Sequence, residues 1–361
     1  MKPIEQLMHC GKYYTYMDAL KERFKAQSRQ MGFKAESPTD YEQWKKALRK
    51  RLADITGLTR LTYTDPAPEK LETVQMEGYS REKWIMQTEP GVTMPFYILF
   101  PDGCKSGGKN KVIIAPHGHG SAGKYCVAGR TDIPFVANAV KTYNYAYGVE
   151  FVKRGYTVFC PDARGFGERR ETNSQGDSEE AWLRQSCLQL NQMAIPMGIT
   201  VMGMWIWDLM RLTDYIVSRN DCDADHIACC GLSGGGLQTL YFTAMDDRIR
   251  CGITSGYFYG SLESLVELTQ LCSCNYVPHL WETCDMGDIG ALIAPRPFLI
   301  ESGRQDPLNG KRGLENVKEQ LDITGKAYDL FNARDFLIWH IFDGPHMWNG
   351  EKSYDFIQKY I

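Results

Sequence analysis

The chain has 361 residues, which is long enough to bury a large hydrophobic core in one α/β domain with additions. Its 41 Lys and Arg residues are balanced by 44 Asp and Glu residues, which argues against a nucleic-acid partner. The N-terminal residues lack the apolar segment of a signal peptide, and the longest apolar run, near residues 199–210, is too short to span a bilayer. We therefore expect a cytoplasmic protein that binds neither nucleic acid nor a membrane.

The twelve cysteines are scattered along the chain. Cys160, Cys229 and Cys230 fall in apolar runs that are typical of a protein core. Buried and unpaired thiols are typical of a reducing compartment, which agrees with the expected cytoplasmic location.

The first 70 residues are predicted to form a helical extension packed on the core. Residues 12–58 have a helical pattern, and Thr39–Glu42 is interpreted as a capping box before an amphipathic helix that ends at Gly57. The apolar face of this helix consists of Trp44, Leu48, Leu52 and Ile55. Its basic outer face is expected to be solvated.

Residues 71–361 are predicted to form one α/β domain. Strand-like runs at residues 83–87 and 94–100, separated by a turn signal, predict a hairpin at a sheet edge. From residue 111 onward strands alternate with helices, which indicates a mostly parallel, doubly wound sheet with helices on both faces. The expected strands lie at residues 112–115, 157–160, 227–231, 251–254, 298–301 and 336–342. The clearest helices lie at residues 146–153, 200–218, 235–245 and 314–323.

Two long connections, residues 165–196 and 255–285, interrupt this alternation after strand ends. In an open α/β sheet the ligand crevice lies outside the carboxyl ends of the strands, so these insertions are predicted to roof a site. The aromatic residues expected to line its substrate pocket are Tyr257, Tyr259, Trp281 and Trp348.

The segment 227–236 predicts a strand, a sharp turn and a helix, with Ser233 at the apex of the turn. Gly231 and Gly235 keep the flanking turns from colliding, so the hydroxyl group would stand clear of the sheet edge. A Gly-x-Ser-x-Gly pattern alone also fits an ordinary glycine-rich connection between a strand and a helix. The surrounding residues favour a nucleophile.

A serine nucleophile needs a base and a carboxylate that orients the base, and in this fold class they follow in the order Ser, acid, His. His346 is the histidine after Ser233 that lies in a loop just past a strand. Asp306 lies in the loop after the strand at residues 298–301 and is the predicted acid. Asp343 is the alternative acid, or else a turn residue that supports the His346 loop.

The segment His117-Gly118-His119 follows the strand at residues 112–115, where the second oxyanion donor would lie. We predict that the backbone N–H groups of Gly234 and His119 form the oxyanion hole. The His-x-His spacing could also serve zinc, but no third Cys, His or carboxylate completes a recognisable ligand set. Cys272 and Cys274 are expected to be packing residues. We therefore predict neither a metal nor a cofactor.

Together these motifs resemble the α/β-hydrolase superfamily, and within it the branch of acetyl-xylan-esterase-like and dienelactone-hydrolase-like bacterial esterases. The resemblance covers about residues 110 to 350 by the order of its motifs. It is carried by residues 231–235, 161–167, 294–297, 302–307 and His346. Two positions depart from the pattern: His119 replaces an aromatic residue or glycine, and Pro345 replaces the glycine before His346.

The resemblance implies an acyl-ester hydrolase with a Ser233, Asp306, His346 triad, in which residues 71–361 form the catalytic domain. Its expected partner is a small-molecule ester, chiefly an acetyl ester of a carbohydrate or another hydroxylated molecule. Whether the chain forms a homo-oligomer is left open. Two alternatives are a peptidase of the prolyl-oligopeptidase kind, which normally carries a large β-propeller, and a catalytically silent binding protein on the same fold.

Overall fold

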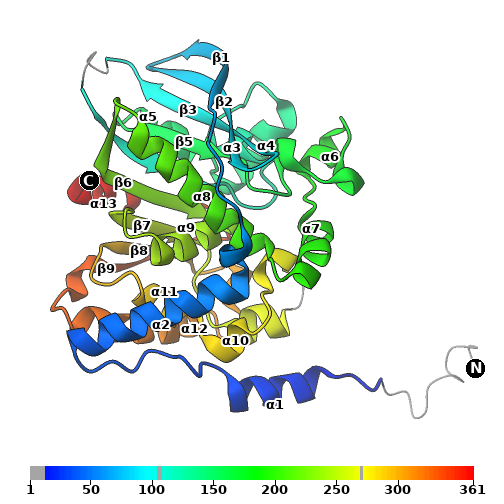
Figure 1. Cartoon of the computed structure of the whole chain (residues 1–361), viewed down its shortest axis with the longest axis vertical. Coiled ribbons are helices and arrows are strands. Elements are labelled where there is room, and N and C mark those ends of the chain that lie inside the picture. Colours follow the sequence, from blue (N-terminus) through cyan, green and yellow to red (C-terminus); the bar gives the residue numbers. More distant parts are fainter. Residues whose placement is uncertain (1–12, 104–107, 269–270) are drawn as a thin grey trace, which may run out of the picture.

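The alternating strand and helix patterns assemble into one mixed sheet in the computed structural model, which describes residues 13–103, 108–268 and 271–361 (Figure 1). Its strands are β1 (Glu69–Met76), β2 (Tyr79–Glu89), β3 (Val92–Pro101), β4 (Asn110–Ile114), β5 (Thr157–Pro161), β6 (Cys222–Leu232), β7 (Cys251–Ser255), β8 (Phe298–Gly303) and β9 (Leu337–Phe342). They lie side by side in the order β1-β2-β3-β5-β4-β6-β7-β8-β9. The three pairs β1-β2, β2-β3 and β3-β5 are antiparallel. The five remaining pairs, from β5-β4 to β8-β9, are parallel, which confirms the predicted mostly parallel sheet.

Helices cover both faces of the sheet, as predicted (Figure 1). They are α1 (Met17–Gln27), α2 (Pro38–Thr56), α3 (Lys124–Val127), α4 (Pro134–Tyr143), α5 (Tyr147–Val152), α6 (Glu179–Leu183), α7 (Cys187–Ala194), α8 (Val201–Ser218), α9 (Gly234–Met245), α10 (Leu280–Thr283), α11 (Met286–Ala291), α12 (Leu314–Asp329) and α13 (Ser353–Tyr360).

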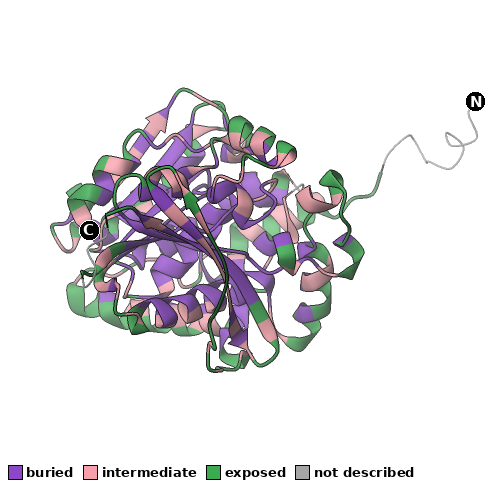
Figure 2. Ribbon diagram, turned by 90° about the horizontal axis from the view of Figure 1, so that it is seen from above, coloured by how far each residue is buried: buried purple, intermediate pink, exposed green. Residues whose placement is uncertain are grey.

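Successive side chains of β6 enter different cores, because strand residues point alternately to the two faces of a sheet. Cys229 belongs to the same hydrophobic core as Leu212 of α8, whereas Cys230 belongs to a second core with Phe151 of α5 and Phe356 of α13. Figure 2 shows these central strands largely buried between the helical layers. Because the middles of these strands are buried, a site that solvent can reach must lie at the strand ends.

The predicted hairpin forms from β2 and β3, but it is not the edge of the sheet. β1 pairs outside it, with Val74 opposite Arg81. Most side chains of β1 are exposed and only Leu71, Val74 and Met76 are apolar, so the alternation of apolar and polar residues is weak and the strand was missed.

The N-terminal amphipathic helix exists as α2, but it begins two residues earlier than the predicted capping box. Ser37 is the N-cap, and its hydroxyl accepts a hydrogen bond from the Asp40 N–H. Leu48 and Leu52 of α2 are buried in the same core as α9 and α11. Its basic face is not simply solvated, because Arg49 pairs with Asp247 at 2.7 Å. The domain boundary placed at residue 70 stays a prediction.

The two insertions contain short helices. Residues 165–196 include α6 and α7, and residues 255–285 include α10 and a π-helical turn at Leu262–Glu267. Within the described part of the chain, no single helix is long and apolar enough to cross a membrane. One pair, Cys187–Met197 with Val201–Ser218, meets the length and composition test together, bent by 93°.

Candidate active site

The loops that follow five parallel strands carry the predicted site residues. Ser233 directly follows β6, and Asp306 and His346 lie a few residues after β8 and β9. His119 lies in the loop after β4, and the 161–167 segment begins at the end of β5. Because these strands are parallel, their carboxyl ends share one edge of the sheet, and the sequence-predicted residues converge there.

Ser233 sits in a strained turn between β6 and α9. Its backbone has φ of 59° and ψ of −119°, a conformation that is rare for a residue with a side chain. A Cβ atom on Gly231 would lie only 2.5 Å from the Gly235 carbonyl oxygen, so the turn requires glycine there. The Ser233 N–H donates to the Ser255 carbonyl at 2.8 Å, which fixes the turn against the end of β7.

The predicted acid and base are in contact. His346 Nδ1 lies 2.7 Å from Asp306 Oδ2, and the Asp306 side chain is almost completely buried. The imidazole lies over Gly256, where a Cβ atom would stand 2.8 Å from His346 Cε1. Gly256 follows Ser255, the residue paired with Leu232 at the end of β6. The histidine ring is therefore beside the strand ends that carry Ser233.

Among the hydrogen bonds between described residues, none joins Ser233 Oγ to His346 Nε2. The expected hydrogen-bonded chain of three residues is thus present only in its Asp306 to His346 half. Catalytic hydrogen bonds are often long or poorly aligned without substrate, so the missing contact does not remove His346 as the candidate base.

The alternative acid, Asp343, points elsewhere. Its side chain is exposed and accepts a hydrogen bond from Gln305 Nε2 at 2.5 Å. The geometry therefore favours Asp306 over Asp343 as the partner of His346.

His117 holds the loop after β4 from inside the protein. Its Nε2 atom accepts the Ala163 N–H at 3.1 Å, and its Nδ1 atom lies 2.9 Å from the Gly118 carbonyl. Burial lowers the pKa of His117 to about 4, so the ring is neutral at pH 7 and can accept one hydrogen bond while donating the other. This side chain is structural and does not face the cavity beside Ser233.

His119 and Gly234, the predicted oxyanion donors, lie against each other. A Cβ atom on Gly234 would lie 2.8 Å from His119 Nδ1, and the His119 carbonyl accepts the Tyr145 hydroxyl at 2.7 Å. Both residues line the same cavity as Ser233. An oxyanion hole formed by their backbone N–H groups therefore stays a prediction, which this shared lining permits.

Buried ion pairs connect the 161–167 segment to α3, which follows the His119 loop, and to α8. Asp162 accepts hydrogen bonds from the Lys124 N–H at 2.7 Å and from Lys124 Nζ at 2.6 Å. Asp208 of α8 binds Arg164 at 2.7 Å and Arg169 at 2.6 Å. Although burial alone would raise it, the two guanidinium groups lower the pKa of Asp208 to about 2. The family resemblance included this segment, but the sequence did not predict that it would pair with Lys124 and Asp208.

The cavity beside Ser233, called here the Ser233 cavity, has a volume of about 220 Å³. Both insertions contribute to it, as predicted for a roof. Its lining residues are His119, Gln185, Ser233, Gly234, Tyr257, Tyr259, Leu271, Cys272, Asn275 and Leu308. Tyr257 and Tyr259 are thus where the sequence placed them.

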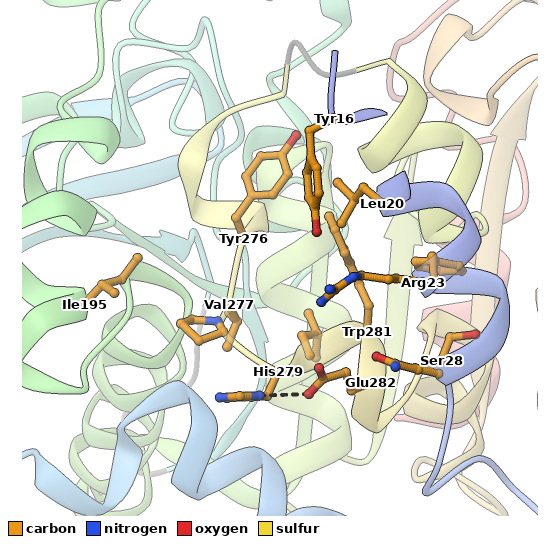
Figure 3. A pocket seen from close by; sticks show the side chains of 14 residues that line it. Tyr16, Leu20, Arg23, Ser28, Ile195, Tyr276, Val277, His279, Trp281 and Glu282 are labelled. Carbon is orange, nitrogen blue, oxygen red and sulfur yellow. Dashed lines mark hydrogen bonds and ion pairs between the residues drawn. The ribbon is translucent and has the colours of Figure 1, made fainter. Parts of the chain in front are cut away.

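Two of the predicted substrate-binding residues lie elsewhere. Trp348 is fully buried and stacks on Tyr147 with ring centroids 4.6 Å apart, so it belongs to a hydrophobic core. Trp281 lines a different pocket, of about 430 Å³, between α1 and residues 276–282, as Figure 3 shows beside Leu20 and Arg23. The prediction for Trp348 was wrong, because an aromatic residue in a core and one in a cleft look alike in sequence, whereas Trp281 lies in a cleft other than the Ser233 cavity.

The sequence shows no third ligand that completes a set with His117 and His119, but the fold brings three thiols to His119. The side chains of His119, Cys187, Cys272 and Cys274 meet, with their potential ligand atoms all within 4.8 Å of one another. His117 is not part of this group. Cys187 comes from the other insertion, and only the fold brings it to the remaining three residues.

The sequence and the structure both resemble known hydrolases. The sequence model of the Abhydrolase family matches residues 11–334. Over 280 residues the chain is 30% identical to YtaP of Bacillus subtilis (strain 168), a protein named as a hydrolase, covering 76% of this chain and 85% of YtaP.

Two solved structures share the fold. A protein of Bacteroides fragilis NCTC 9343 that is described as an acetyl xylan esterase has a TM-score of 0.72 at 19% identity, covering 94% of this chain and 84% of its own. Methylesterase BT1017 has a TM-score of 0.67 at 20% identity, covering 96% of this chain and 70% of its own.

Proposed function

This chain belongs to the Abhydrolase family, and we propose that it is a serine esterase that removes a short acyl group, chiefly acetyl, from a carbohydrate or another small hydroxylated molecule. The observation that carries the proposal is the Asp306 to His346 hydrogen bond of 2.7 Å beside the strained Ser233 turn. A carboxylate, an imidazole and a serine that lines a cavity at one sheet edge are the parts that acyl transfer needs.

In this mechanism Ser233 Oγ attacks the ester carbonyl while His346 Nε2 takes its proton. Asp306 keeps the imidazole in the tautomer with hydrogen on Nδ1 and stabilises the imidazolium ion. The backbone N–H groups of His119 and Gly234 donate to the oxyanion. His346 then protonates the leaving alcohol, and water activated by the same histidine hydrolyses the acyl-enzyme. Water is the only reactant besides the ester in this mechanism.

The size and lining of the Ser233 cavity support a short acyl group and a polar alcohol. The cavity has a volume of about 220 Å³, with the rings of Tyr257 and Tyr259 offering flat faces and Gln185 a polar tip. The acetyl xylan esterase description of one structural neighbour agrees with this reading. A general lipid esterase would instead need a broad aliphatic surface.

The peptidase alternative finds less support. The described residues before β4 form α1, α2 and three strands of the central sheet, so they build no β-propeller. The catalytically silent alternative would leave the Asp306 to His346 pair without a role.

The proposal is tested with p-nitrophenyl esters of increasing acyl length. Each methylene beyond the cavity's capacity must displace packed side chains, and overpacking costs about 1 to 3 kcal/mol. We expect kcat/KM to fall by at least roughly tenfold from acetate to octanoate, since about 1.4 kcal/mol is one decade in rate. A flat or rising profile would contradict the short-acyl assignment, and no turnover of any ester by folded protein would contradict the esterase.

A further inference from the structure

Four side chains of types that can ligate metals, from three distant segments, meet next to the Ser233 cavity. His119 comes from the loop after β4, Cys187 is the first residue of α7, and Cys272 and Cys274 belong to the second insertion. All their potential ligand atoms lie within 4.8 Å of one another. Cys187 and Cys274 are buried, whereas His119 and Cys272 are partly exposed.

The dimensions of this cluster match a tetrahedral zinc site. With Zn–S bonds of about 2.3 Å and Zn–N bonds of about 2.0 Å, tetrahedral geometry places sulfur and nitrogen ligands about 3.5 Å apart. The observed distance from His119 Nε2 to Cys274 Sγ is 3.5 Å. A disulfide would instead bring two sulfur atoms to about 2.05 Å, and the three cysteines are free thiols.

The surrounding hydrogen bonds hold the ligands in place without a metal. Asn275 Nδ2 donates to the Cys272 carbonyl at 2.9 Å and lies 3.6 Å from Cys274 Sγ, while the Tyr257 hydroxyl fixes its Oδ1 at 2.7 Å. Asn191 of α7 donates to the Ser273 carbonyl at 2.8 Å. An amide N–H directed at a sulfur ligand is a typical outer partner of a metal thiolate.

We propose that His119, Cys187, Cys272 and Cys274 bind one zinc ion. Three thiolates and one imidazole favour zinc, whereas magnesium and calcium prefer oxygen ligands. Because four protein ligands fill a tetrahedral shell, the ion has no open position and serves as a structural link. It joins the loop that carries the His119 N–H to both insertions, so it fixes the roof of the Ser233 cavity.

The first test measures metal content. The full chain is purified under reducing conditions without chelators, with zinc in the growth medium, and zinc per chain is measured by mass spectrometry. We expect about one zinc ion per wild-type chain, and less than about a tenth of one after the double substitution of Cys187→Ala and Cys272→Ala. Cys284→Ala is the matched control, because Cys284 is a buried free thiol in the same insertion outside the cluster, and it should keep its zinc.

The second test identifies the ligands in the wild-type protein, so it does not depend on a variant that folds. X-ray absorption at the zinc edge should show three sulfur neighbours at about 2.3 Å and one nitrogen at about 2.0 Å. Folded wild-type protein with less than about a tenth of a zinc ion, iron in its place, or a disulfide within the cluster would overturn the proposal. Metal content is independent of activity, so a zinc-loaded protein without esterase activity would refute the proposed function and leave this inference standing.

Discussion

Ser233 shows how a single residue can be predicted from its neighbours. Its φ of 59° carries a cost of about 1 to 3 kcal/mol, which the glycines around it and the bond from its N–H to Ser255 make tolerable. The Gly-x-Ser-x-Gly spacing and the preceding apolar strand were both visible in the sequence. The positions of Ser233, Asp306 and His346 at one sheet edge could be predicted because each follows a strand in a fixed chain order.

The surroundings of some other residues could not be predicted. Nothing in the sequence distinguishes Trp348 in the core from Tyr257 in the Ser233 cavity, since both lie in aromatic-rich segments. Cys187 lies far from Cys272 along the chain, so only tertiary structure could complete the cluster with His119.

The first prediction separates Asp306 and Asp343, the two candidates for the acid that orients His346. Asp306→Asn should lower kcat by at least roughly a hundredfold, because the amide cannot stabilise an imidazolium and favours the wrong tautomer. Asp343→Asn should lower kcat by less than about threefold, because its carboxylate contacts Gln305 and not His346. Steady-state kinetics on p-nitrophenyl acetate measures both, and the reverse ranking would move the acid to Asp343.

At the level of elements, buried ion pairs fasten the 161–167 segment to α8. Asp208 lies between Arg164 and Arg169, and Trp205 Nε1 of the same helix donates to the Arg164 carbonyl at 2.9 Å. The segment also supplies the Ala163 N–H to His117 at 3.1 Å. The 161–167 segment therefore connects α8 to His117 in the loop after β4, which lies beside Ser233.

Asp208→Asn should destabilise the fold by about 3 to 5 kcal/mol, because it leaves the buried Arg169 guanidinium without its carboxylate and Arg164 with Glu89 alone. Urea unfolding followed by circular dichroism measures the free energy of unfolding. The control is Glu180→Gln, which breaks the ion pair with Arg184 between two largely exposed side chains and should change the free energy by less than about 1 kcal/mol. Equal effects of the two substitutions would show that the Asp208 cluster does not brace the fold.

At the level of the whole molecule, the order of the strands from β4 onward and the helices α5, α8, α9 and α12 was predictable because each has a clear period or apolar run, whereas α4 and α11 were not predicted. The edge strand β1 was not, since its side chains are mostly exposed. The start of α2 was misplaced because Ser37 and Thr39 are both good caps, and Pro38 at the first helical position favours Ser37. Local sequence patterns thus predicted the central strands better than the edge strand and the helix start.

The buried and neutral His117 makes the stability of the whole fold depend on pH. Burial lowers its pKa to about 4, whereas a histidine in the unfolded chain titrates near about 6.5. Between these values the unfolded state binds more protons, so this group's contribution is present above about pH 6.5 and is lost as the pH falls toward 4. The loss should amount to about 3 kcal/mol at most.

The contribution is isolated by comparing urea unfolding of the wild type and His117→Gln from pH 4 to 7. Glutamine can accept the Ala163 N–H but does not titrate, so the difference in stability between the two proteins should shrink as the pH falls. Asp285 and Glu301, whose pKa values burial raises, act in the opposite direction but are present in both proteins. A difference that stays constant over this range would contradict a neutral His117.

The most direct measurement of the proposed mechanism is covalent labelling with a fluorophosphonate, followed by peptide mass spectrometry. The account predicts one adduct per chain on Ser233 and loss of esterase activity in proportion to labelling. Ser233→Ala should melt at the wild-type temperature, take no label and lose at least roughly a thousandfold in kcat/KM. A folded wild-type protein with no adduct on Ser233, or a Ser233→Ala variant with turnover close to that of the wild type, would contradict it.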